Sequence, residues 1–134
     1  MKVVIVDGQS GRMGQLLIER IRSADLSCEI LAIGTNALAT AAMLKAGADA
    51  GATGENALLV ACRSAEIIAG PIGILSADAL LGEITPAMAV AIGQSPAKKL
   101  LLPINQCNHI IVGAQALPLS RLMEEAVTLL RSML

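Results

Sequence analysis

The chain has 134 residues, of which 54% are hydrophobic, 16% are charged and none is Phe, Tyr or Trp. A protein without aromatic rings lacks the surfaces on which single-stranded nucleic acids stack, and a formal net charge of −1 gives no basic footprint for nucleic-acid binding. We therefore expect a single domain over residues 1–134, large enough to bury a substantial core, with no nucleic-acid partner.

The apolar character of the chain, with a mean hydropathy of +0.67, predicts that a second copy covers part of its surface, so we expect a homo-oligomer and most simply a homodimer. The first apolar run is too short for a signal peptide, and the uncharged stretch 100–120 is interrupted by Pro, Asn and Gly, so we expect no membrane partner. Three cysteines without a CxxC pair indicate reduced thiols and a cytoplasmic location. The spacing of His, Cys and carboxylate residues predicts no metal site.

Strand-type and helix-type segments alternate along the whole chain. We expect strands over 2–7, 28–34, 50–53, 66–70, 99–104 and 109–112. We expect helices over 12–23, 37–46, 55–63, 74–81, 86–94 and 118–133. Short apolar strands separated by helices are typical of a parallel sheet that is covered on both faces. The predicted fold class is α/β, a Rossmann-like, doubly wound and mainly parallel sheet with helices on both faces, in which strand 99–104 lies beside strand 66–70.

A loop with glycine at every third position follows the first expected strand and precedes the first helix. It consists of Gly8, Gln9, Ser10, Gly11, Arg12, Met13 and Gly14. This order is typical of dinucleotide-binding folds, where the glycines allow a sharp turn and bring backbone amides close to a pyrophosphate. We interpret all seven as cofactor-binding residues for NAD(P) or another nucleotide, with Gly11 leaving the space that the phosphates need. The alternative is that turn geometry alone requires these glycines.

Other loops on the same edge of the predicted sheet add candidates, because ligands of such folds bind beyond the carboxyl ends of the strands. These candidates are Thr35, Asn36, Gly70, Pro71, Ile72, Gly73 and Asn105, the last expected beside the loop after residue 70. Two features depart from the usual dinucleotide pattern. The second strand ends in Gly34-Thr35-Asn36 where an acidic residue usually binds the ribose, and the carboxylate of Asp7 would repel a phosphate unless Arg12 or a metal ion neutralises it.

Three residues are weak candidates for catalysis. Asp7 either takes part in chemistry or accepts hydrogen bonds from the loop amides and caps the first helix. Glu83 is an acid or base if it is buried in a pocket, and otherwise a solvated residue that favours a helix dipole. Cys107 is either a nucleophile, with His109 two residues away, or a structural thiol. We therefore expect a nucleotide-binding protein; the alternatives are a nucleotide-dependent oxidoreductase or transferase completed by a dimer partner, and a ligand-free interaction module.

Two resemblances accompany these residues. The string Gly11-Arg12-Met13-Gly14 resembles the nicotinamide loop of dihydrodipicolinate reductases, whose paired catalytic histidines have no counterpart because His109 is the only histidine. Over nearly its whole length the chain resembles a family of short bacterial Rossmann-like proteins known as a domain of unknown function. That resemblance implies the fold and leaves substrate and reaction open. The strings that carry it begin at Gly34, Gly51, Gly70, Gly82 and Leu102.

Overall fold

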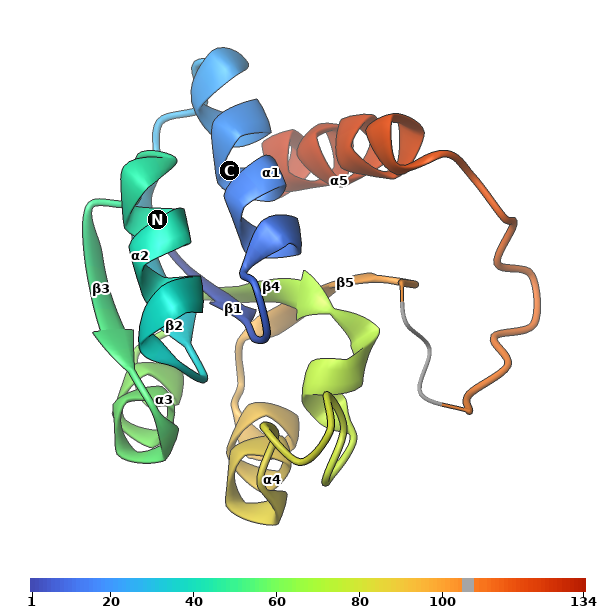
Figure 1. The fold of residues 1–134 in the computed structure, drawn as a ribbon. Coiled ribbons are helices and arrows are strands. Elements are labelled where there is room, and N and C mark those ends of the chain that lie inside the picture. The colour runs from blue at the N-terminus through green and yellow to red at the C-terminus, as the bar shows by residue number, and fades with distance from the viewer. Residues whose placement is uncertain (105–107) are drawn as a thin grey trace.

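The computed structural model describes residues 1–104 and 108–134 as strands and helices in alternation (Figure 1). The strands are β1 (Lys2–Asp7), β2 (Glu29–Gly34), β3 (Ala50–Thr53), β4 (Ile67–Pro71) and β5 (Lys98–Leu102). The helices are α1 (Arg12–Ser23), α2 (Ala37–Lys45), α3 (Glu55–Cys62), α4 (Pro86–Gln94) and α5 (Leu119–Met133), and a 3₁₀ helix, η1 (Ile72–Leu75), follows β4. Most expected elements are present, with ends that differ by one or two residues.

The five strands form one parallel sheet in the order β3-β2-β1-β4-β5. The predicted neighbourhood of β4 and β5 is confirmed, with Ile67 opposite Lys98 and Pro71 opposite Leu102. From β1 the chain winds outward through β2 to β3, and then crosses back to β4 on the other side of β1. The winding reverses between β1 and β4, so the loops that follow these two strands separate there and open a crevice at the carboxyl edge of the sheet.

Helices cover both faces of the sheet, as Figure 1 shows, and the central strand β1 contributes to a core on each side. Val3 and Ile5 are buried beneath α1, α2 and α5, whereas Val4 and Val6 are buried beneath α3, α4 and η1. Side chains alternate between the faces of a strand, so a continuous apolar run is what a strand covered on both faces requires. The doubly wound Rossmann-like fold is therefore confirmed.

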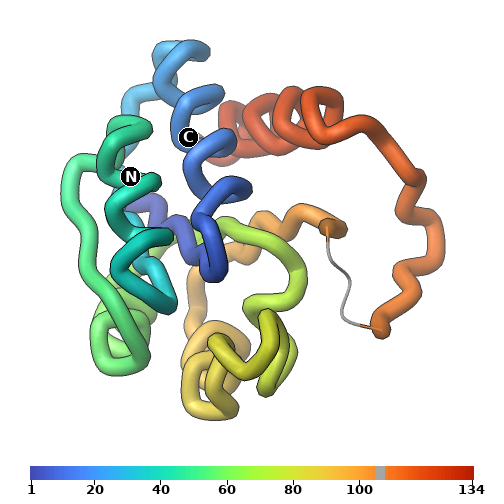
Figure 2. The backbone as a smooth tube through the Cα atoms, in the orientation of Figure 1, coloured from blue at the N-terminus to red at the C-terminus, as the bar shows by residue number. Residues whose placement is uncertain are grey.

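Two expected elements are absent, so both predictions are wrong. In place of a helix over 74–81, η1 is followed by turns in which Asp78, Leu80 and Leu81 have φ of 65°, 55° and 57°. A right-handed helix cannot contain these left-handed residues, and the turns bury Leu80 while leaving Leu81 96% exposed. Residues 109–112 do not belong to the five-stranded sheet of the described residues: residues 108–118 follow an arc outside it, with Val112 98% exposed (Figure 2).

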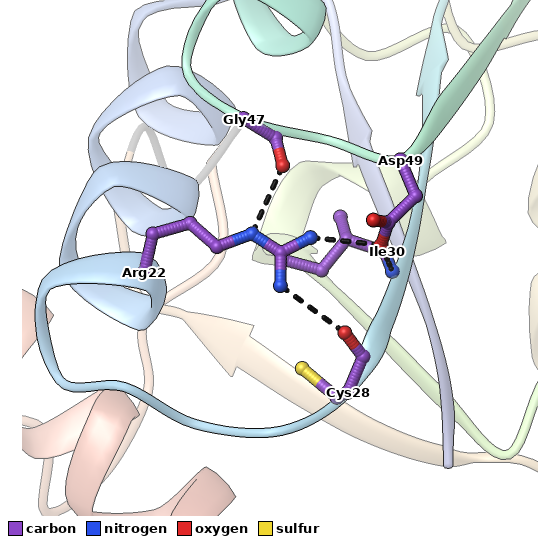
Figure 3. Close-up of polar contacts among 5 residues, drawn as sticks. All are labelled: Arg22, Cys28, Ile30, Gly47 and Asp49. Atoms are coloured by element: carbon purple, nitrogen blue, oxygen red, sulfur yellow. Dashed lines mark hydrogen bonds and ion pairs between the residues drawn. The ribbon is translucent and has the colours of Figure 1, made fainter.

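A hydrogen-bonded cluster around Arg22 connects segments at the amino edge of the sheet (Figure 3). Arg22, in the last turn of α1, donates to the carbonyls of Gly47 and Cys28 at 2.9 and 3.1 Å and pairs with the Asp49 carboxylate at 2.8 Å. Asp49 also accepts the Ile30 amide of β2 at 2.7 Å. The hydrogen bond from the Ile30 backbone amide and the hydrogen bond from the Arg22 guanidinium hold the pKa of Asp49 below its ordinary value. The cluster thus joins the starts of β2 and β3 to the end of α1.

No helix among residues 1–104 and 108–134 combines the length and the apolar character needed to cross a lipid bilayer.

Candidate functional site

A cavity of about 210 Å³ lies at the carboxyl edge of the sheet, where the winding reverses. The glycine loop forms one wall, and the end of β4 and the turn after η1 form the other. The cavity is lined by Asp7, Gly8, Gln9, Ser10, Arg12, Met13, Pro71 and Leu80. Seven of these eight residues were candidates from the sequence; Leu80 was not, because an isolated leucine in an apolar stretch carries no local signal for a ligand site.

The glycine loop is tight, and its glycines are required by packing. Gly11 has a φ of 75° and donates its amide to the Gly8 carbonyl at 2.9 Å. A Cβ atom added to Gly11 would lie 2.7 Å from the Ala39 Cα atom and 2.9 Å from its carbonyl oxygen. The space beside Gly11 is therefore filled by the backbone of α2, and our expectation that Gly11 leaves it open for phosphates is wrong.

Asp7 is 4% exposed at the end of β1 and is held by the loop that follows. One carboxylate oxygen accepts the Gly8 amide and the other accepts the Gly14 amide, both at 2.8 Å. Burial raises the pKa of Asp7 above its ordinary value, and the nearby charge of Glu83 raises it further. The hydrogen bonds from the backbone amides act to lower this pKa but do not outweigh burial. With both oxygens engaged by backbone, Asp7 sets the shape of the loop in this structure.

Glu83 joins the glycine loop to the loop after β2. Its Oε1 atom accepts the Gln9 amide at 2.9 Å, the Thr35 hydroxyl at 2.6 Å and the Asn36 side-chain amide at 2.8 Å. Burial acts to raise the pKa of Glu83, but these three hydrogen bonds outweigh it and hold the pKa below the ordinary value. Glu83 is thus an ionised acceptor at neutral pH that links the two loops, and its role in catalysis remains a prediction.

Thr35 and Asn36 do not line the cavity; their side chains contact Gln9 and Glu83 beside it, and their expected role in cofactor binding remains a prediction. The Asn36 Oδ1 atom accepts the Ala39 amide at 2.9 Å and so caps α2, while its Nδ2 atom donates to the Gln9 carbonyl at 3.0 Å. The three loops that form the carboxyl edge are therefore tied together by side chains whose own positions are fixed by helix capping and turns.

The remaining candidates divide into two groups. In the first, Pro71 lines the cavity, but a Cβ atom on Gly70 would collide with the Val6 carbonyl oxygen, so Gly70 serves the close approach of β4 to β1. Ile72 and Gly73 belong to η1 and do not line the cavity. In the second, Asn105 and Cys107 lie outside the described residues, so the expected place of Asn105 near the loop after residue 70 and the alternative roles of Cys107 remain predictions.

The charge around the cavity is uneven. The cation of Arg12 is exposed, whereas Asp7 lines the cavity from the buried end of β1 and Glu83 accepts the Gln9 amide of the glycine loop. Larger hollows, of about 460 and 360 Å³, lie between α1 and α5 and at the amino edge of the sheet. Neither lies at the edge where ligands of this fold class bind. Within residues 1–104 and 108–134, no three His, Cys, Asp or Glu side chains are grouped so as to hold a metal ion.

Comparison with solved structures shows a distant likeness to the dodecameric FMN-dependent Ubix-like decarboxylase from Escherichia coli O157:H7. The two chains are 12% identical with a TM-score of 0.44, over 99% of this chain and 93% of that one. No curated protein matches the chain. The family model described as "Domain of unknown function (DUF3842)" matches residues 2–134, and the chain belongs to that family.

Proposed function

We propose that this protein binds a nucleotide or dinucleotide, with NAD(P) as the first candidate, at the carboxyl-edge cavity. One observation carries the proposal: the cavity between the glycine loop and β4 lies where the winding of the sheet reverses, with the exposed cation of Arg12 at its rim. The phosphates would lie against Ser10 and Arg12, at the outer side of the loop and away from Asp7. A charged donor at the rim suits phosphate oxygens.

The size of the cavity limits how much of such a ligand it encloses. Small-molecule pockets commonly have volumes of about 300–1,000 Å³, so a cavity of about 210 Å³ would enclose one end of a dinucleotide. The rest would extend over the open edge of the sheet. A second copy of the chain would supply the missing wall, and α2 offers an apolar surface for it, with Leu38 67% and Leu44 42% exposed. We place this assembly in the cytoplasm, where the described cysteines, Cys28 and Cys62, would remain as the free thiols seen here.

Isothermal titration calorimetry of the purified chain with NAD⁺, NADP⁺, ATP and AMP tests the proposal. We expect at least one of them to bind, and we expect Arg12→Gln to weaken that binding by about tenfold or more, because a charge-assisted hydrogen bond to phosphate is lost. Arg20→Gln is the matched control: it removes the same charge from the other end of α1, outside the cavity lining, and should leave the affinity unchanged.

A second candidate, a ligand-free interaction module, is favoured by one specific observation. The amides of Gly8, Gln9 and Gly14, which a phosphate loop would offer to its ligand, already donate to Asp7 and Glu83. The same titration separates the two functions. Absence of binding heat for all four nucleotides at millimolar concentration would contradict the nucleotide proposal and leave the interaction module.

A further inference from the structure

We propose that Glu83 recognises the ribose of the bound nucleotide, and that it selects a free 2′,3′-diol against a 2′-phosphate. The inference rests on the proposed function and deepens it, since it names the class of nucleotide. In dinucleotide-binding folds the ribose carboxylate usually stands at the end of the second strand. Here it would come from a different loop, between η1 and α4, and meet the end of β2 in space.

The end of β2 has no room for an acidic side chain. A Cβ atom on Gly34 would lie 2.5 Å from the Thr40 amide nitrogen and 2.7 Å from the Asn36 carbonyl oxygen. Such distances exclude any side chain unless the start of α2 moves away. An acidic side chain at position 34 is therefore excluded by the packing of α2 on β2, and the next two residues are the uncharged Thr35 and Asn36, so a carboxylate near the end of β2 has to come from another segment.

Glu83 supplies a carboxylate near the end of β2. Its Oε1 atom is held by the Gln9 amide, from the loop expected to meet the ligand, and by the side chains of Thr35 and Asn36, which directly follow β2. These three donors come from two loops that are far apart in the sequence and converge on one oxygen. The carboxylate therefore occupies the junction between the glycine loop and the end of β2, where the usual ribose carboxylate of this fold class is placed.

Glu83 adjoins the cavity through Gln9, which lines it, without being a lining residue itself. In the part of the chain that the structure describes, Oε2 accepts no hydrogen bond, and the residue is half-buried at the edge of the sheet. An ionised carboxylate accepts hydrogen bonds and donates none. It therefore suits the two hydroxyl donors of a ribose diol and repels a phosphate in the same position.

The backbone before Glu83 holds it in place without a ligand. Leu80 and Leu81 adopt left-handed conformations, and the Glu83 amide donates to the Leu80 carbonyl at 3.2 Å. Ile84, the next residue, is fully buried and donates to the Ala79 carbonyl at 3.1 Å. A carboxylate fixed between a buried residue and a tight turn loses little conformational freedom when it binds, which favours affinity for the diol.

Titration calorimetry with NAD⁺ and NADP⁺, which differ by the 2′-phosphate alone, tests the inference on the intact chain. We expect wild type to bind NAD⁺ at least about tenfold more tightly than NADP⁺, because the 2′-phosphate would face a fixed negative charge. Glu83→Gln keeps the size of the side chain and removes the charge, so it should weaken NAD⁺ binding and bring the two affinities close together. Glu55→Gln removes a carboxylate at the N-terminus of α3 that bonds Thr85, and it should leave the preference unchanged.

The outcomes distinguish this inference from the function on which it rests. If wild type binds neither dinucleotide nor ATP or AMP, the proposed function fails and the inference fails with it. If nucleotides bind and wild type prefers NADP⁺, or shows no preference, the proposed function stands and the role of Glu83 is wrong. The same conclusion follows if Glu83→Gln, shown to be folded by circular dichroism, keeps the wild-type preference.

Discussion

Arg22 connects three backbone segments at the amino edge of the sheet, so its replacement by Met measures how far this cluster stabilises the fold. Arg22→Met keeps a stem of similar length but removes the guanidinium. The carbonyls of Gly47 and Cys28 then lose their donor, and Asp49 loses its cation. The hydrogen bond from Ile30 to Asp49 remains, so the variant removes the cross-link without removing the carboxylate.

The structure sets the size of the effect. The ion pair contributes only about 0.5 kcal/mol to the free energy of unfolding, because the side chains of Arg22 and Asp49 are 31% and 52% exposed to screening solvent. The hydrogen bonds to the two carbonyls add about 1 kcal/mol each. The total is about 2–3 kcal/mol, and at about 3–4 °C per kcal/mol for a domain of this length Tm should fall by about 6–12 °C.

Thermal unfolding followed by far-ultraviolet circular dichroism measures this change, since the chain lacks the Trp and Tyr that fluorescence needs. Arg20→Met is the control, because the Arg20 side chain, on the same helix, forms no hydrogen bond or ion pair with the described residues. A carboxyl with a lowered folded-state pKa, such as Asp49, stabilises fully above its unfolded pKa and loses that contribution as pH falls through the folded pKa. The Tm difference between wild type and Arg22→Met should therefore narrow over that acidic range. Equal Tm values for the two variants, or a difference that is constant with pH, would refute the reasoning.

Two further predictions concern packing and assembly. Gly11→Ala should lower the free energy of unfolding by about 2–5 kcal/mol, from left-handed strain and from overpacking against the Ala39 backbone. Gly93→Ala, where nothing lies within 4 Å of the added Cβ atom, should stabilise helix α4 by about 0.5–1 kcal/mol. Urea unfolding measures the free energy of unfolding of both variants, and a similar loss of stability in both would contradict this reasoning. Light scattering should give a mass above the monomer's 13.7 kDa, which Leu38→Glu on the exposed face of α2 should reduce to the monomer value. A monomeric wild type at high concentration would contradict the predicted self-association.

The fold was predictable because its signals are local. The central strands β1, β2 and β4 are short, mostly apolar runs. Helices α2 and α4 begin at capping residues, Asn36 and Thr85, that accept the Ala39 and Met88 amides. The turns after η1 were not predictable in this way. The apolar residues there fit a helical pattern, and the left-handed Leu80 is stable because it is buried by tertiary packing that no local pattern encodes.

The candidate site likewise contains a part that local sequence signals predict and a part that depends on tertiary packing. The glycine loop was found from its spacing, because a strand, a tight turn and a helix are neighbours in the sequence. Glu83 bonds Gln9, Thr35 and Asn36 across separations of 74, 48 and 47 residues, and a single sequence contains nothing that joins such positions. The clash that excludes a side chain at position 34 likewise results from the packing of α2 on β2, which the local sequence does not encode.

Helix α5 reaches its place through residues 108–118, which contain neither helix nor strand and pass outside the sheet (Figure 2). Its attachment rests on one apolar face, which includes Met123, Ala126, Val127 and Leu130 and packs on the side of the sheet covered by α1. Domain swapping would preserve this packing, because the same face of α5 would fit the same surface on another copy of the chain. A swapped pair would then make the contacts of two closed monomers, and the balance between the two forms would be set by strain in the tether.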